Sequence, residues 1–158
     1  MFSNTRMSKR ITLIPLDLTH QVLATSDILD NLLHPKGVPL VGANVDIVYK
    51  TTAFRKMLHD LMTFFAATYA SVFNITEGPP LHDPLAVAAV LPGLDWEWEY
   101  VKVIVDTHGA EIGRTLKHPP KEGETVVRVG VRVDVARFWK LLFKMVDVVD
   151  GRGKVQWR

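Results

Sequence analysis

The 158-residue chain contains no cysteine. Disulfide bonds, thiolate metal sites and cysteine nucleophiles are therefore excluded from its chemistry. A reducing compartment is compatible with this composition, and we expect a cytoplasmic protein. The chain also lacks any apolar run close to the roughly 20 residues that a membrane span needs. Positive charges near the N-terminus are followed by no signal-peptide core, because Pro15 and Asp17 interrupt the next apolar stretch.

Excess charge of one sign is lacking as well. The formal net charge is only +2, and no block of like charge stands out. This balance argues against nucleic acid or an anionic membrane as a partner. Hydrophobic residues make up 47% of the chain and charged residues 23%, which is typical of a globular domain and not of a disordered or fibrous protein. The length suffices for one domain with its own core.

Strand-like and helix-like patterns are mixed along the chain, which favours the α/β class. Residues 11–16 form a short apolar run typical of a buried strand in a parallel sheet. Residues 25–27 supply N-cap candidates for a helix that ends near Leu33. After Thr52 the apolar residues recur at spacings of three and four, which predicts a helix of four or five turns. They are Phe54, Met57, Leu58, Leu61, Phe65 and Tyr69.

The second half of the chain continues the mixture. Asp83 and Pro84 suit the N-cap and first positions of a short apolar helix. Residues 100–105 and 127–133 alternate between apolar and polar side chains and predict two strands. Residues 113–123 are polar and predict a loop. A closing helix follows, with Phe138, Leu141, Leu142 and Met145 on one face.

Two segments together resemble the inosine/uridine-preferring nucleoside hydrolase family. The first, Ile11-Thr-Leu-Ile-Pro-Leu-Asp-Leu-Thr-His20, is close to the family's segment of the form I-P-L-D-V-T-H. The second, Pro80-Leu-His-Asp-Pro-Leu-Ala86, resembles the family's H-D-P-L-A motif. Both occur in the family's order with a helical stretch between them. Residues 112–115 and 131–142 are similar to the family's C-terminal end, so the resemblance spans nearly the whole chain.

The resemblance implies a fold, a reaction and ligands. The fold would be the C-terminal half of the nucleoside hydrolase fold, a mainly parallel sheet flanked by helices, with residues 1–158 as one partial domain. The complete enzyme would hydrolyse the N-glycosidic bond of purine or pyrimidine ribonucleosides to free base and ribose. Members of the family use a bound Ca²⁺ ion and are often homo-oligomers, although no interface is readable in this sequence.

The resemblance also assigns roles to His82 and Asp83. Asp83 matches the family's calcium ligand, and calcium prefers oxygen ligands such as carboxylates. His82 matches the histidine that lies near the leaving base and helps to protonate it, a role that suits a group titrating near neutral pH. From the residues alone two alternatives stay open: Asp83 as a plain helix cap and His82 as a loop histidine without a chemical role.

Other aromatic and histidine side chains carry weaker hypotheses. Tyr69 is a weak candidate for contact with the substrate base, and the alternative is a core-facing aromatic stripe that includes Phe64 and Phe65. We interpret His20 as mainly structural, at the turn after a buried strand. The Trp96-Glu-Trp98 segment is interpreted as a half-buried edge element in preference to a stacking surface for nucleosides.

The chain departs from the family in its acidic residues. The family's aspartate-rich motif D-x-D-x-x-x-D-D supplies most calcium ligands and the base that activates water, yet no D-x-D occurs in this sequence. The family's segment that holds the ribose would precede Ile11. We therefore expect the chain to start after the first half of the fold, as a gene fragment, a misassigned start or a truncated paralogue. The alternative functions are a non-catalytic remnant, acting at most as a binding or oligomerising module, and an unrelated small α/β binding domain.

Overall fold

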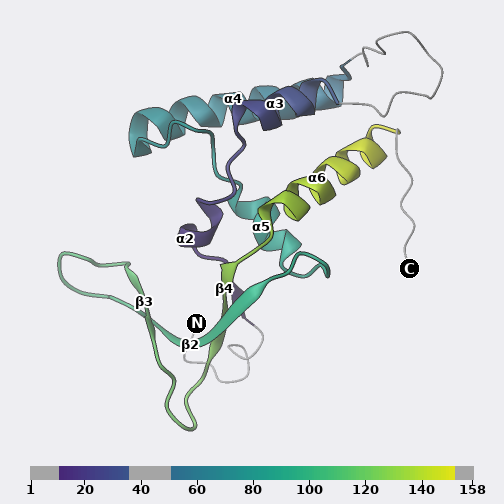
Figure 1. Ribbon diagram of the computed structural model, residues 1–158. Helices are drawn as coiled ribbons and strands as arrows, with labels where there is room; N and C mark the ends of the chain where they lie inside the picture. Colours follow the sequence, from purple (N-terminus) through teal and green to yellow (C-terminus); the bar gives the residue numbers. More distant parts are fainter. Residues whose placement is uncertain (1–10, 36–50, 152–158) are drawn as a thin grey trace. The chain divides into compact units, whose positions relative to one another are not determined.

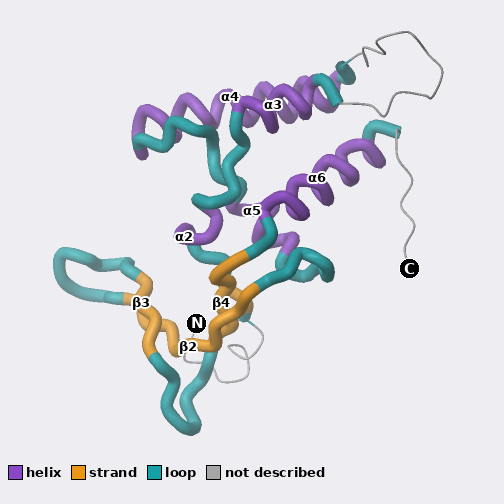
Figure 2. The backbone as a smooth tube through the Cα atoms, viewed as in Figure 1, coloured by secondary structure: helices purple, strands orange, loops and turns teal. Residues whose placement is uncertain are grey.

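A computed structural model describes residues 11–35 and 51–151 (Figure 1). Within them the chain forms two compact units. Unit 1 takes its described residues from 11–21 and 82–135, and unit 2 from 22–35, 51–81 and 136–151. The elements, coloured by type in Figure 2, are β1 (Thr12–Leu13), α2 (Leu16–Thr19), α3 (Ser26–Leu33), α4 (Ala53–Phe73), α5 (His82–Ala88), β2 (Glu97–Val105), β3 (Thr115–His118), β4 (Val127–Arg132) and α6 (Val135–Val149).

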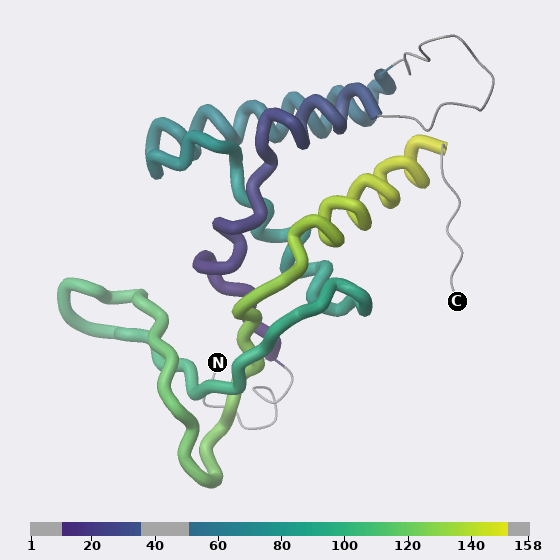
Figure 3. The backbone as a smooth tube through the Cα atoms, viewed as in Figure 1, coloured from purple at the N-terminus to yellow at the C-terminus, as the bar shows by residue number. Residues whose placement is uncertain are grey.

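Unit 1 is built on a four-stranded sheet with the strand order β1-β4-β2-β3. β1 pairs with β4 in parallel, with Thr12 opposite Arg128, and Figure 3 shows the start of the described chain beside the green β4 segment. The other two pairings, β2 with β4 and β2 with β3, are antiparallel. The α/β class is confirmed, but the predicted mainly parallel sheet is wrong for the described strands. Only residues 106–114 join β2 to β3, fewer than a parallel crossover needs.

β3 forms where the sequence predicted a loop. Its four residues pair with the end of β2, so that Thr115 lies opposite Val105 and His118 opposite Lys102. Three of the four side chains are exposed and only Leu116 is half-buried. An edge strand of this kind is held by backbone hydrogen bonds and leaves no apolar alternation in the sequence.

The two predicted strands are confirmed as β2 and β4, and they carry the apolar core of the sheet. Val101 and Val103 of β2 pack with Val127 and Val129 of β4, all of them buried. Ile11 and Leu13 pack against this cluster from the N-terminal segment. The spacing of two residues places each valine pair on one face of its strand. β2 begins at Glu97, three residues before the predicted start, and the Trp96 and Trp98 rings stack beside it with centroids 4.9 Å apart.

Unit 2 contains the long helix expected after Thr52. Thr52 is its N-cap, and the Thr52 hydroxyl oxygen accepts a hydrogen bond of 3.2 Å from the Arg55 backbone N–H. The helix runs to Phe73 and is longer than predicted. The interpretation of its aromatic stripe as core-facing is wrong for Phe64 and Phe65, which are 68% and 43% exposed. α3 lies beside α4 and spans the residues predicted for it. No helix in the described part of the chain is both long and apolar enough for a membrane span.

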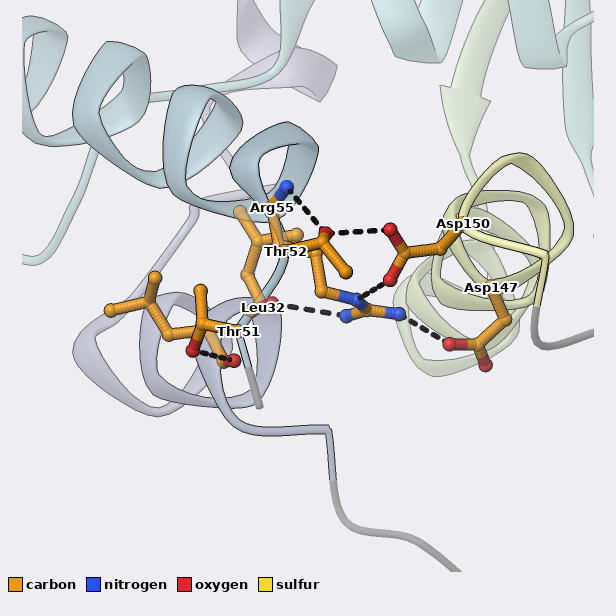
Figure 4. Close-up of polar contacts among 7 residues, drawn as sticks. Leu32, Thr51, Thr52, Arg55, Asp147 and Asp150 are labelled. Atoms are coloured by element: carbon orange, nitrogen blue, oxygen red, sulfur yellow. Dashed lines mark hydrogen bonds and ion pairs between the residues drawn. The ribbon is translucent and has the colours of Figure 1, made fainter. Parts of the chain in front are cut away.

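A buried arginine joins the three helices of unit 2. The Arg55 side chain is 1% exposed and lies among acceptors from α3 and from the C-terminal end of α6 (Figure 4). Its Nε donates to Asp150 at 2.7 Å, one terminal nitrogen donates to the Leu32 carbonyl at 3.0 Å, and the other forms an ion pair with Asp147. Thr52 also donates to Asp150, at 2.6 Å. The buried positive charge of the Arg55 guanidinium is therefore compensated by the two carboxylates.

Candidate functional site

The two sequence motifs meet in unit 1, although 63 residues separate their contacting members. α2 carries the end of the first motif and α5 opens with the second, and the two helices are in contact. The Thr19 hydroxyl oxygen lies 2.7 Å from Nδ1 of His82. The His20 and His82 rings lie with their centroids 5.7 Å apart at an angle of 53°. A hydroxyl and two imidazoles thus gather beside the N-terminal end of α5.

α2 is held close to β4 by a glycine. A Cβ atom on Gly130 would lie 2.9 Å from the Ile14 side chain and 3.1 Å from that of Leu18, both closer than ordinary contact. The absence of that atom lets the α2 turn sit against the strand, where Leu18 is 1% exposed and Thr19 2%. Pro15 precedes the turn, and its carbonyl accepts hydrogen bonds of 3.1 Å from the backbone N–H groups of Leu18 and Thr19. Packing therefore fixes the position of Thr19.

α5 begins two residues earlier than the sequence predicted, because Pro84 was the expected first helical residue. His82 is its first residue and Asp83 lies within the first turn, so the prediction of Asp83 as the N-cap is wrong. An N-cap residue has non-helical backbone angles, whereas the helical conformation here already includes Asp83. The burial of Leu85 and Ala88 sets which face of α5 points inward. Asp83 is exposed, and its negative charge at the N-terminal end is favourable to the helix dipole.

His82 is half-buried, and its surroundings favour the neutral ring. Burial lowers the pKa of His82 because it penalises the imidazolium form, and the charge of His20 lowers it further. The Asp83 carboxylate acts in the opposite direction and raises the pKa, but the net shift is downward. A neutral imidazole carries one N–H and one acceptor nitrogen, so the chemistry of His82 depends on which nitrogen holds the proton.

The described residues do not form a calcium site by themselves. Within residues 11–35 and 51–151 there is no group of three or more histidine, cysteine, aspartate or glutamate side chains able to hold a metal ion. Calcium takes six to eight oxygen ligands in proteins. Asp83 is one exposed carboxylate and can provide at most two of them. The predicted calcium ligand is thus accessible, and the described residues lack the rest of its shell.

The remaining candidate, Tyr69, lies on α4 in unit 2. It is half-buried, and its ring centroid lies 5.3 Å from that of Phe73 on the next turn. Its contact with a substrate base stays a prediction. A pocket in unit 1 is bordered by α2 and the sheet, with Asp17, Gln21 and Gly130 in its lining. Neither His82 nor Asp83 lines that pocket.

Thr19 is the site residue that sequence reasoning missed. Its place beside His20 in the first motif gave no indication of a contact with the second motif. The one available signal was the joint occurrence of the two motifs, because the side chains that touch are separated by 63 positions. Side-chain contacts at that separation leave no periodic pattern in a single sequence.

Comparison with known proteins places these motifs in context. Residues 1–140 match the family described as inosine-uridine preferring nucleoside hydrolase. The chain is 22% identical to the uridine nucleosidase of Saccharomyces cerevisiae over 162 residues, which cover 95% of this chain and 44% of that protein.

Two solved structures share the fold. A plant nucleoside hydrolase matches with a TM-score of 0.60 and 29% identity, over 84% of this chain and 39% of that one. The purine-preferring ribonucleoside hydrolase of Gardnerella vaginalis matches with a TM-score of 0.57 and 28% identity, over 82% of this chain and 37% of that one. The chain spans less than half the length of each of these three proteins.

Proposed function

The chain belongs to the inosine-uridine preferring nucleoside hydrolase family, and we propose that it supplies the leaving-group side of a ribonucleoside hydrolase active site. In that reaction the bond between C1′ of the ribose and a nitrogen of the base breaks. A water oxygen bonds to C1′, one water proton is released, and the departing nitrogen gains a proton. The products are ribose and the free base.

The contact between Thr19 and His82 carries this proposal. It joins the side chains of two separate motifs at 2.7 Å, and one of them belongs to the H-D-P-L-A segment. A reaction through an oxocarbenium-like state needs its leaving group neutralised. His82 is the side chain that we assign to this proton transfer, because an imidazole exchanges protons near neutral pH.

Asp83 is proposed as one carboxylate ligand of a calcium site in the complete enzyme. Its exposure at the start of α5 leaves the carboxylate accessible, and carboxylate oxygens suit a hard cation. The other ligands and the base that activates water would come from outside the described residues. No step of the reaction is therefore assigned to Asp83 alone.

The substrate class proposed is purine or pyrimidine ribonucleosides. The relatives' own names differ in this respect, since one is a uridine nucleosidase and another is purine-preferring. The described residues include one candidate for contact with the base, Tyr69, and that single aromatic ring does not distinguish the two classes.

A chimera tests the proposal. Residues 11–158 of this chain would replace the matching portion of the Gardnerella vaginalis hydrolase, and release of base from inosine and uridine would be followed by chromatography. We expect turnover by the chimera and a loss of 100-fold or more on His82→Ala, which is about the lower end of what general acid catalysis contributes. His108→Ala, which changes an exposed histidine of the same unit, is the matched control. A folded chimera that keeps its full rate after His82→Ala would exclude the proposed role.

A second candidate function is a non-catalytic binding module. It is favoured by the lack of a metal-binding group of three side chains among the described residues. In this case the isolated chain would bind ribonucleosides, measured by titration calorimetry, and a correctly folded chimera would not turn them over. Turnover by the chimera would reject it.

A further inference from the structure

We propose that the outer edge of β1, the side away from β4, and the pocket beside it form a docking surface. Its partner is the portion of the nucleoside hydrolase fold that has no counterpart in this chain. The chain covers 39% and 37% of the two solved structures, so more than 60% of each lies outside the match. The inference rests on the proposed function, because the docked portion would bring the remaining calcium ligands and the base that activates water.

The two edges of the sheet in unit 1 differ in character. Among the strands of the described chain, β1 lies at one end of the sheet and β3 at the other. β3 presents Lys117 and His118 to solvent, and charged side chains are a common protection of an edge that faces water. Residues 11–14, Ile-Thr-Leu-Ile, carry no charge and are half-buried. An apolar edge without such protection is suited to pair with another strand.

The pairing of β1 with β4 fixes which backbone groups face outward. The Arg128 N–H donates to the Ile11 carbonyl at 3.4 Å, and Thr12 lies opposite Arg128 in the parallel register. Successive residues of a strand direct their backbone groups to opposite sides. The N–H and C=O of Thr12 therefore point away from β4, whereas the N–H of Leu13 points toward it. Parallel strands occur mainly inside larger, covered sheets, so the outward groups of Thr12 are suited to a further strand.

The pocket continues this edge with an apolar surface. It has a volume of about 740 Å³ and is lined mostly by apolar side chains, among them Leu13 of β1, Val129 of β4 and Leu16 at the start of α2. Leu16 is 61% exposed, and covering such a side chain removes apolar area from water. A strand added to a sheet edge gains affinity from its backbone bonds and specificity from pockets for its side chains. The β1 edge and this pocket provide both.

The unmatched portion of the fold suits this surface better than a second copy of the chain does. β1 is only two residues long, Thr12–Leu13, so two copies paired edge to edge would share a very short ladder. β1 also lies within residues 1–140, which match the nucleoside hydrolase family. More than 60% of each solved relative is available to cover the edge and the pocket together.

Amide hydrogen exchange, resolved by residue with NMR, tests the docking surface without turnover. It would be measured on the 158-residue chain and on the chimera that joins residues 11–158 to the unmatched portion of the Gardnerella vaginalis hydrolase. We expect the Thr12 amide to exchange rapidly in the 158-residue chain and at least 100-fold more slowly in the chimera. The Leu13 amide is the internal control, because it faces β4 and should be protected in both proteins.

A pair of substitutions tests the pocket. Leu16→Ser should lower the melting temperature of the chimera by about 3 °C or more, because the added portion covers Leu16, and should hardly change that of the 158-residue chain. Ile112→Ser is the matched control, since Ile112 is 68% exposed in the same unit and does not line the pocket. It should have little effect in either protein. Equal shifts for the two substitutions in the chimera would overturn the assignment of the pocket.

The exchange data decide the proposal in every case. A slowly exchanging Thr12 amide in the 158-residue chain would overturn it, because the edge would then be covered by the chain itself or by a second copy. Rapid exchange of Thr12 in a folded chimera would overturn it as well. A chimera that does not fold, although the 158-residue chain does, would show that the surface does not accept this portion. A protected Thr12 amide in a chimera that releases no base would reject only the proposed function.

Discussion

At the scale of single residues, His82 is where the family resemblance and the geometry agree most closely. The sequence motif singled it out, and the structure adds a hydroxyl within hydrogen-bond distance, a neighbouring imidazole and partial burial. The sequence could not supply these surroundings, because Thr19 comes from the other motif. The local motif predicts a chemical role for His82, and the tertiary fold places the Thr19 hydroxyl beside its ring.

The leaving group should determine how much His82 matters. In the chimera, His82→Ala should slow hydrolysis of purine nucleosides by about 100-fold or more, because the departing base needs a proton. A riboside with an activated leaving group such as nitrophenolate departs without one, so its rate should fall far less. Steady-state kcat and kcat/KM for both substrates would show the difference. Equal losses on the two substrates would remove the proton-donor role.

Substitutions of Asp83 distinguish a structural role of its side chain from a role as a calcium ligand. Asp83 lies inside the first turn of α5 and is exposed, so Asp83→Ala should cost less than the roughly 1 kcal/mol of a lost N-cap. Urea denaturation of the isolated chain measures this cost. In the chimera, Asp83→Asn removes one negative charge and should weaken calcium binding in titration calorimetry. Parent-like calcium affinity for Asp83→Asn would show that this carboxylate is no ligand.

At the scale of elements, the sequence predicted the helices and strands that bury one face, because burial on one side leaves a periodic pattern of apolar residues. β4 alternates because its valines enter the core, and the helix after Thr52 shows the spacing of three and four. The prediction that the aromatic side chains on this helix face the core was wrong for Phe64 and Phe65, which are exposed in the described structure. Periodicity reports a helix and an apolar face, and it does not report what covers that face.

Elements held by backbone pairing or by distant charges were missed. β3 has mostly exposed side chains and therefore reads as a loop, and the antiparallel direction of β2 is set by short connections. Arg55 is nearly fully buried in an apolar helix, with its two carboxylates more than 90 residues away along the chain. A charged side chain near the start of a helix is normally expected to be exposed to solvent. No local signal could therefore have identified this buried network.

The Arg55 network should be the most sensitive point of unit 2. Arg55→Met would leave Asp150, whose side chain is 3% exposed, without its cation, and we expect a loss of about 3–5 kcal/mol in the free energy of unfolding. Adding Asp150→Asn should restore part of it, because the uncompensated charge is then removed. Lys56→Met is the control, since Lys56 and Asp60 form an exposed pair on the same helix. Urea denaturation midpoints would compare the three variants, and similar midpoints for Arg55→Met and Lys56→Met would contradict this account.

At the scale of the whole molecule, the chain spans less than half the length of the relatives. Under the proposed function it carries one side of a reaction site. The described residues include His82, the proposed proton donor, and Asp83, the one proposed carboxylate ligand. They offer no group of three side chains for a metal. A glycosidic bond needs both leaving-group protonation and an activated water, and these two functions are served by different side chains. We therefore propose that the chain contributes to catalysis only when joined by the remaining ligands and base.

Hydrolysis by the purified 158-residue chain alone tests this claim most directly. The chain would be incubated with inosine and with uridine in the presence of calcium, and ribose release would be measured with and without a chelator. We expect no release above the uncatalysed rate with either substrate, because one carboxylate cannot hold a calcium ion that takes six to eight oxygens. Steady ribose release that the chelator abolishes would contradict the account, since the chain would then contain a complete site.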